Sequence, residues 1–276
     1  MFLSTAILVL QEILEAALLV SVLLVLSRQL TRTSEQNLRI SLSWLPVAIG
    51  AGLVGSWMYA YFFPEISQWF DDVGLEITNA AIQGVILLAL MIFCFMFTSV
   101  NCLHRTHRLG QLTPVLMAVM VSLGIVREVS EIILYLNGVL ANPTNVTPTV
   151  LGASLAAGIG VSSGIVLYFL LLSLSVAWSY RLSMLLLALF AGNLASQIVI
   201  LLTQADWIPY SRELWDSSAF IPEFSITGQL LYALVGYEAN PSLIQVVCYC
   251  CSAMIIVVSP LFLHAWRKAT GGSANV

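Results

Sequence analysis

Arg127-Glu128-Val129-Ser130-Glu131 lies near the middle of an apolar run from about Leu112 to Leu140, and this placement decides the class of the protein. An apolar run of about 20 or more residues is long enough to cross a bilayer as a helix. Ionised groups at that depth are costly, so we expect them to face the protein interior or a water-filled path. Glu128 and Glu131 are three residues apart and project from one helix face, where both carboxylates can approach one cation.

A second pair of glutamates lies in the first apolar run, in Gln11-Glu12-Ile13-Leu14-Glu15, 116 positions earlier and with the same spacing. Four carboxylates that face one another at low dielectric cannot all stay ionised without a counter-charge. Arg127 supplies one positive charge, and the natural further partner is a di- or trivalent metal ion. Carboxylate oxygens suit ferric iron, manganese and ferrous iron. The alternative is a buried ion pair that only fixes helix packing, but this does not explain why the pair is repeated.

The composition indicates an all-α polytopic membrane protein. Hydrophobic residues make up 59% of the 276 residues and charged residues only 9%, whereas a soluble domain has roughly 25% charged residues. The apolar runs are continuous rather than alternating, which disfavours a transmembrane β-barrel. We predict seven transmembrane helices, one in each of these runs: Phe2–Leu26, Leu42–Phe63, Ile77–Val100, Leu112–Leu140, Val150–Trp178, Leu182–Thr203 and Leu243–Trp266.

Basic residues predict the orientation in the membrane. Eight of the ten Lys and Arg follow alternate runs, namely Arg28, Arg32, Arg39, Arg105, Arg108, Arg181, Arg267 and Lys268. By the positive-inside rule, the N-terminus is then outside and the C-terminus cytoplasmic. Acidic residues gather in the outer loops, and those of the second loop are Glu65, Asp71, Asp72 and Glu76. These acids either concentrate cations at an outer opening or simply belong to a surface that lacks Lys and Arg.

A second internal match indicates duplication. Asn79-Ala-Ala-Ile-Gln83 in the third run corresponds to Asn193-Leu-Ala-Ser-Gln197 in the sixth, at an offset of 114. Three helices per half would give an inverted repeat, whose binding sites lie near the bilayer midplane. We therefore expect a single membrane domain over residues 1–276. It would consist of repeat one (1–103), repeat two (104–205), an external segment with a short re-entrant or surface helix (206–240), and the seventh helix (241–268).

Polar and small residues within the runs have two interpretations each. The amides of Asn79, Gln83, Asn193 and Gln197, with Ser130, either orient the carboxylates or metal, or form interhelical hydrogen bonds. Small residues recur at every fourth position in the second and fifth runs, at Ala48, Gly52, Ser56 and Ala60 and at Gly152, Ala156, Gly160 and Gly164. Such stripes permit close packing, either between the halves or between the subunits of a homo-oligomer.

The paired motifs resemble those of the high-affinity iron permease family. Its hallmark is Arg-Glu-x-x-Glu in the first and fourth helices, and it comprises fungal permeases that work with a multicopper ferroxidase as well as bacterial permeases. The resemblance spans essentially the whole chain, including Gly236-Tyr237, Pro241-Ser242 and Gln245. It implies iron uptake across the cytoplasmic membrane, with Glu12, Glu15, Glu128 and Glu131 contacting the iron. It also implies an extracytoplasmic oxidase or iron-delivery partner. The first motif departs from the family, because Gln11 stands where an arginine is usual.

The resemblance leaves the ion open between Fe3+ and Fe2+. Transport of another divalent metal, Mn2+ or Pb2+, and a proton-coupled carrier of organic cations are the alternatives. An intramembrane enzyme or electron-transfer subunit would need haem-ligand histidines or a nucleophile–base pair at membrane depth, and the sequence shows neither. We therefore expect a transporter with no permanent cofactor and with iron as its substrate. We expect it to contact membrane lipid and to bind no nucleic acid.

Overall fold

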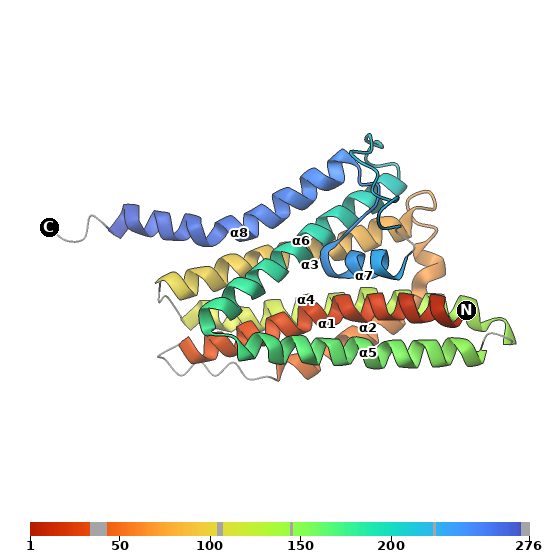
Figure 1. The fold of residues 1–276 in the computed structure, drawn as a ribbon, viewed down its shortest axis with the longest axis horizontal. Helices are drawn as coiled ribbons and strands as arrows, with labels where there is room; N and C mark the ends of the chain where they lie inside the picture. The colour runs from red at the N-terminus through yellow and green to blue at the C-terminus, as the bar shows by residue number, and fades with distance from the viewer. Residues whose placement is uncertain (34–42, 104–106, 144–145, 223–224, 272–276) are drawn as a thin grey trace.

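The computed structural model describes residues 1–33, 43–103, 107–143, 146–222 and 225–271, with the side chains of 31–33, 99–103, 107–111 and 260–271 left out. The described residues form eight helices arranged as an elongated bundle (Figure 1). Their bounds are α1 Phe2–Thr33, α2 Trp44–Ile66, α3 Gly74–Leu103, α4 His107–Leu140, α5 Val146–Ser173, α6 Val176–Gln204, α7 Ile226–Val235 and α8 Leu243–Gly271.

The all-α membrane class is confirmed. Six of the described helices, α1 to α6, are long and apolar enough to cross a bilayer. The other two apolar stretches are shorter, and they are Ile226–Val235 in α7 and Leu243–Ser259 in α8. Each of the seven predicted runs corresponds to one long helix, but the boundary between the fifth and sixth helices differs from the prediction.

The boundary between the fifth and sixth helices was predicted wrongly. The chain leaves the helix at Leu174 and Ser175, where Ser175 has the extended angles φ −60 and ψ 150. Arg181, expected in the loop, lies within α6, and its guanidinium is 5.5 Å from the ring centroid of Trp178. Hydropathy does not show this break because the residues on both sides of it are apolar. The other basic residues of the predicted cytoplasmic loops, apart from Arg28, lie outside the residues whose side chains are described: Arg32, Arg39, Arg105, Arg108, Arg267 and Lys268.

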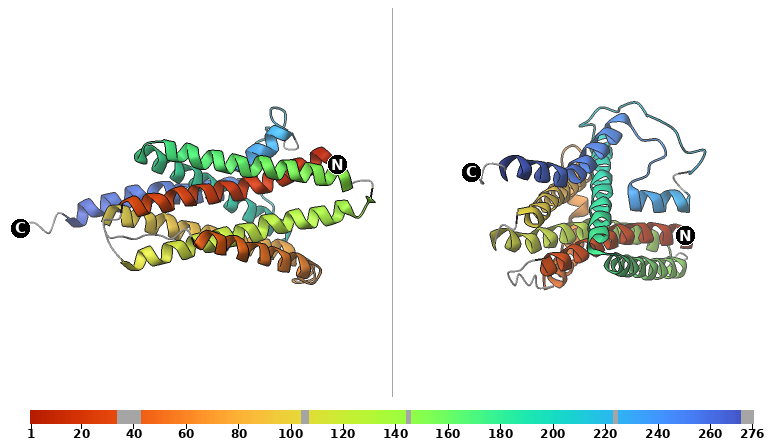
Figure 2. Two further views of the ribbon diagram at one scale, coloured as in Figure 1. Left: turned by 90° about the horizontal axis from the view of Figure 1, so that it is seen from below. Right: turned by 60° about the vertical axis from the view of Figure 1, so that its left-hand side comes forward.

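Each of the first three helices packs against one of the next three. Helix α1 runs beside α5, α2 beside α4, and α3 beside α6, while α8 covers α6 (Figure 2). The stripes of small residues make these approaches possible. A Cβ on Gly52 would lie 2.7 Å from Cβ of Ile125, and one on Gly160 would lie 2.6 Å from Cγ2 of Ile13. The stripes therefore serve packing within one chain, between α2 and α4 and between α5 and α1.

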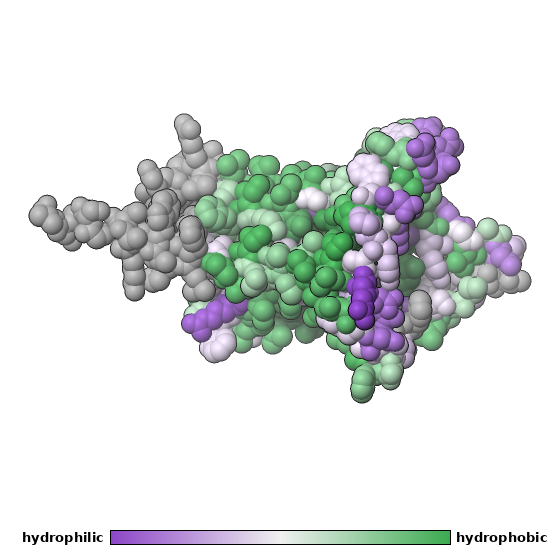
Figure 3. All heavy atoms as spheres, turned by 90° about the horizontal axis from the view of Figure 1, so that it is seen from above, coloured by the Kyte–Doolittle hydropathy of each residue, from purple (hydrophilic) through white to green (hydrophobic). Residues whose placement is uncertain are grey.

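The helix faces that pack against one another are buried, and the outward faces are exposed. A buried apolar cluster includes Leu23, Leu90, Phe93 and Met120, all 0% exposed. The outer faces of the bundle carry exposed apolar side chains instead, such as Trp57 of α2, which is 66% exposed. Figure 3 shows much of the visible surface as hydrophobic, with most hydrophilic residues gathered toward one end. An apolar outer surface of this kind suits contact with lipid.

Helix α7 is short and capped at both ends. The side chain of Ser225 accepts a hydrogen bond from the backbone N–H of Gly228 at 3.0 Å. The helix ends at Gly236, which has φ 69 in the left-handed region. A Cβ at that position would lie 2.8 Å from Oδ1 of Asn193, so glycine is required for both conformation and space. Helix α7 contacts α1 and α6, which places it against the bundle next to the first pair of glutamates.

Candidate metal-binding site

The two Glu-x-x-Glu pairs meet around one buried arginine. Helices α1 and α4 contact each other, and Arg127 of α4 extends its guanidinium between them. Its Nη1 donates to Oε1 of Glu128 at 3.1 Å and to Oε2 of Glu15 at 3.4 Å. Its Nε lies 3.4 Å from Oε1 of Glu131, an ion pair without hydrogen-bond geometry. One cation is thus shared by three carboxylates from two helices that are far apart in the sequence.

The fourth carboxylate belongs to Glu12, which is 5% exposed. It interacts with the carboxyl groups of Glu128, Glu131 and Glu15. Within the described part of the chain, Oε2 of Glu12, Oε1 of Glu15 and Oε2 of Glu128 are buried and receive no hydrogen bond when all four carboxyl groups are ionised. A proton on Glu12 would join its carboxyl group to that of Glu128. Leaving a buried charged acceptor unpaired costs about 1–3 kcal/mol or more. Three oxygen atoms from both helices are therefore available to a cationic ligand.

In the described structure, the cation at the centre of these carboxylates is the guanidinium of Arg127. Among the residues whose side chains the structure describes, no group of three or more His, Cys, Asp or Glu is already gathered for metal binding. The guanidinium is the cation on which the glutamates converge. A metal ion that bridged α1 and α4 would take over carboxylate oxygens that Arg127 now contacts.

The residues predicted to support the carboxylates make mostly other contacts. Ser130 donates to the backbone carbonyl of Arg127 at 2.7 Å, a bond within the helix. Asn79 accepts a hydrogen bond from the hydroxyl of Tyr59 at 2.9 Å, which joins α3 to α2. Asn79 therefore makes an interhelical hydrogen bond, which is one of the two roles predicted for this amide.

The other predicted amides lie close to α7 or keep an unused oxygen. Gln197 donates to Oδ1 of Asn193 at 3.1 Å, and Asn193 packs against Gly236. Gln83 is 2% exposed. Among the described residues, its Oε1 and that of Gln197 have no hydrogen-bond partner.

The acidic residues of the second loop lie at the end of the bundle where α2 gives way to α3 (Figure 1). Glu65, Asp71 and Asp72 are exposed, whereas Glu76 is half-buried in the first turn of α3. Asp71 and Asp72 have φ 64 and 69, which are costly for residues other than glycine. The hydroxyl of Tyr59 is within electrostatic range of both Glu76 and Glu131. This tyrosine therefore lies near both the first turn of α3 and the second glutamate pair.

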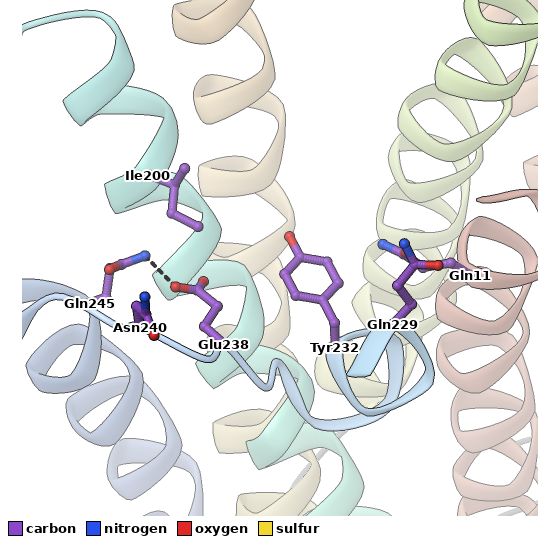
Figure 4. Close-up of a pocket in the computed structure, with 7 residues that line it drawn as sticks. All are labelled: Gln11, Ile200, Gln229, Tyr232, Glu238, Asn240 and Gln245. Carbon is purple, nitrogen blue, oxygen red and sulfur yellow. Dashed lines mark hydrogen bonds between the residues drawn. The ribbon is translucent and has the colours of Figure 1, made fainter. Parts of the chain in front are cut away.

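A cavity of about 460 Å³ opens beside Gln11, the residue that precedes Glu12 (Figure 4). Its lining comprises Gln11, Ile200, Gln229, Tyr232, Glu238, Asn240 and Gln245. Inside it, Gln245 Nε2 donates to Oε2 of Glu238 at 2.7 Å. Burial raises the pKa of the Tyr232 hydroxyl, which therefore stays protonated.

None of the sequence motifs predicts this cavity. Glu238 falls in the predicted external segment, residues 206–240. A usable signal was present, because Glu238 comes two residues after the glycine that ends α7 and seven residues before Gln245.

Comparison with known proteins gives one consistent result. The model of the iron permease FTR1 family matches residues 2–269. The chain is 26% identical over 269 residues to the ferrous iron permease EfeU of Escherichia coli O6:H1, covering 91% of this chain and 94% of that protein. It is 25% identical to ferrous iron permease EfeU of Shigella sonnei, covering 96% of each chain. A putative inactive ferrous iron permease EfeU of Escherichia coli K12 is 24% identical, again over 96% of each. No solved structure matches the chain.

Proposed function

Because this chain belongs to the iron permease FTR1 family and transports iron across a membrane, we propose that the ion crosses between the two Glu-x-x-Glu pairs of α1 and α4. The observation that carries this proposal is the buried carboxylate cluster. Four glutamates surround one arginine, so the site has a formal charge of −3 before any protonation. Three of its buried oxygen atoms have no partner in the described structure. Buried acidic groups on facing helices are what a dehydrated multivalent cation needs in a bilayer.

Arg127 acts as a built-in substitute for the transported ion. In the absence of metal, its guanidinium lowers the cost of holding Glu15, Glu128 and Glu131 together at low dielectric. A di- or trivalent ion attracts the same carboxylates more strongly than a single positive charge does. The arriving ion therefore takes the oxygens and the guanidinium moves aside. The guanidinium returns when the ion leaves, which makes the empty site less costly to regenerate.

The helix pairing supports an inverted repeat as the framework of transport. If α1–α3 and α4–α6 are equivalent halves, α1 against α5 and α4 against α2 are the same contact seen twice. The two glutamate pairs then occupy equivalent positions, and rocking of the halves would open the site to each side in turn. The first motif has Gln11 where the second has Arg127. One guanidinium would therefore serve as the movable positive charge for both glutamate pairs.

The orientation that we propose has the N-terminus outside and the C-terminus in the cytoplasm, with α8 as a seventh spanning helix. Helix α8 ends at the opposite end of the bundle from the N-terminus, as an odd number of crossings requires (Figure 1). Gln29 donates to Ser179 at 2.8 Å, so Arg28 and Arg181 lie at the same end. Two basic residues from different helices therefore mark one face as cytoplasmic by the positive-inside rule.

The curated relatives are named for ferrous iron, which favours Fe2+ as the ion carried. An extracytoplasmic oxidase or iron-delivery protein would supply the ion at the outer face. The acids of the second loop would gather it there. Movement of cations inward is aided by the membrane potential, at about 2.3 kcal/mol per charge per 100 mV.

Uptake of radioactive iron by cells tests the site. The variant with both Glu12→Gln and Glu128→Gln keeps side-chain volume and removes two charges, so we expect its uptake to fall at least about a hundredfold. Glu213→Gln, which neutralises an exposed glutamate, is the matched control. Membrane levels of each variant are measured by immunoblot. Uptake at the wild-type rate by a normally inserted double variant would refute the proposed path.

A further inference from the structure

A single carboxylate, that of Glu238, faces the cavity beside the glutamate pairs, and the cavity is lined mostly by amide side chains (Figure 4). We propose that Glu238, together with the neighbouring amide oxygens, forms a second cation site that iron occupies before it reaches the glutamate pairs. This inference rests on the proposed function, because it assigns a waiting site to the same ion. None of the described residues that line the cavity is basic. Oxygen donors of this kind suit Fe2+ and other hard or borderline cations.

The carboxylate of Glu238 is fixed in place by two other helices. Gln245 at the start of α8 donates to its Oε2 at 2.7 Å, and Ser196 of α6 donates to its Oε1 at 3.3 Å. Gln245 is itself oriented, because its Oε1 accepts the backbone N–H of Ser242. A carboxylate has about four lone-pair positions. These two bonds therefore hold the geometry of the carboxylate and do not by themselves use all of its acceptor positions.

The cavity lies beside the first glutamate motif. Gln11 lines it and is followed directly by Glu12. Tyr232 stands between Glu238 on one side and Gln11 on the other (Figure 4). Its hydroxyl is within electrostatic range of Glu238 and also of Glu15 and Arg127. Tyr232 is therefore near both Glu238 and the inner carboxylates.

The size and charge of the two sites set their order. A cavity of about 460 Å³ has room for a cation that keeps several waters, since one water takes about 30 Å³ of liquid volume. One carboxylate with neutral amides should hold such an ion loosely. The inner cluster, with four carboxylates and one guanidinium, holds it more strongly but requires it to lose water. A weak site followed by a strong one captures the ion in two smaller desolvation steps.

A structural role for Glu238 makes a different prediction. Its hydrogen bonds to Ser196 and Gln245 could serve only to fasten the segment after α7 to α6 and α8. Glu238→Gln has the same shape and retains an acceptor, so it preserves much of that fastening while removing the charge. A fastening role predicts little change in Fe2+ binding, whereas a cation site predicts its loss.

The test is equilibrium binding of radioactive Fe2+ to the purified full chain without oxygen, combined with uptake by cells. We expect two bound ions for the wild type and one for Glu238→Gln, whose KM for uptake should rise about tenfold while its maximal rate stays within about twofold. The Glu12→Gln, Glu128→Gln double variant should lose uptake and the tighter ion but keep the weaker one. Glu213→Gln, an exposed carboxylate outside the cavity, is the control and should match the wild type.

Two outcomes would overturn the waiting site: wild-type stoichiometry and KM in Glu238→Gln, or a fall in its maximal rate with KM unchanged. If Glu238→Gln does not reach the membrane, Glu238→Asp keeps the charge and shortens the side chain. Its KM should then rise several-fold, and an unchanged KM would count against the site. Failure of the proposed function looks different, because the double variant would then keep its uptake whatever Glu238→Gln does.

Discussion

Alanine at Gly160 should disturb the glutamate site from the lipid-side helix α5, without changing any charged residue. A Cβ there would lie 2.6 Å from Cγ2 and 3.0 Å from Cβ of Ile13, the residue that follows Glu12. Carbon atoms need about 3.5–4.0 Å, so α1 and α5 must separate by about 1 Å at the level of the first pair. Overpacking of this kind costs about 1–3 kcal/mol.

Gly158 provides a matched control on the same helix. It lies two residues away, and a Cβ there meets nothing within 4 Å. Both variants gain about 1 kcal/mol of helix propensity from alanine, so their difference isolates the clash. We expect Gly160→Ala to unfold about 2–10 °C below Gly158→Ala in detergent. A displacement near 1 Å can cost about a hundredfold in a positioned site, so iron uptake should fall at least tenfold in Gly160→Ala only.

The reasoning would be refuted if the two alanine variants had the same melting temperature and the same uptake. That result would mean that α5 does not press on α1 at the glutamate pair. A lower melting temperature with normal uptake would be equally informative, because it would separate the packing of α1 from the geometry of the site. Gly160→Leu and Gly158→Leu extend the series, and only the first should abolish uptake.

Three further predictions concern single contacts. Arg127→Met should bind Fe2+ at least about tenfold more tightly, because one nearby positive charge repels a divalent ion by several kcal/mol even at an effective dielectric constant of about 20. The variant should also transport Fe2+ more slowly. Weaker Fe2+ binding than the wild type in a dialysis assay would contradict this prediction. Gly236→Ala should lower stability by about 1–3 kcal/mol in thermal unfolding, since φ is 69 and Asn193 lies 2.8 Å from the added Cβ. Ser56→Ala should cost about 0.6–1.7 kcal/mol in the same assay, because the one hydroxyl hydrogen is shared between the backbone carbonyls of Gly52 at 2.7 Å and, across the helix interface, of Ile125 at 3.0 Å.

Much of the local structure could be predicted from the sequence, because it depends on properties of neighbouring residues. Continuous apolar runs must be helices in a bilayer, where every backbone polar group needs an internal partner. The spacing of Glu128 and Glu131 places both on one helix face for the same local reason. The break at Ser175 was missed, because a change of direction between two apolar helices leaves the hydropathy high on both sides.

The sequence by itself determined the membrane class, most of the helical segments and the place of each glutamate pair within its apolar helix, since hydropathy and helical periodicity act over a few turns of one chain. Only the tertiary structure decided that the guanidinium of Arg127 is shared by Glu15, Glu128 and Glu131. It alone also placed Glu238 in a cavity next to Gln11. Such contacts join residues more than a hundred positions apart, and their geometry depends on how closely whole helices approach. That distance is set by small residues such as Gly52 and Gly160, and the sequence does not indicate which helix each of them packs against.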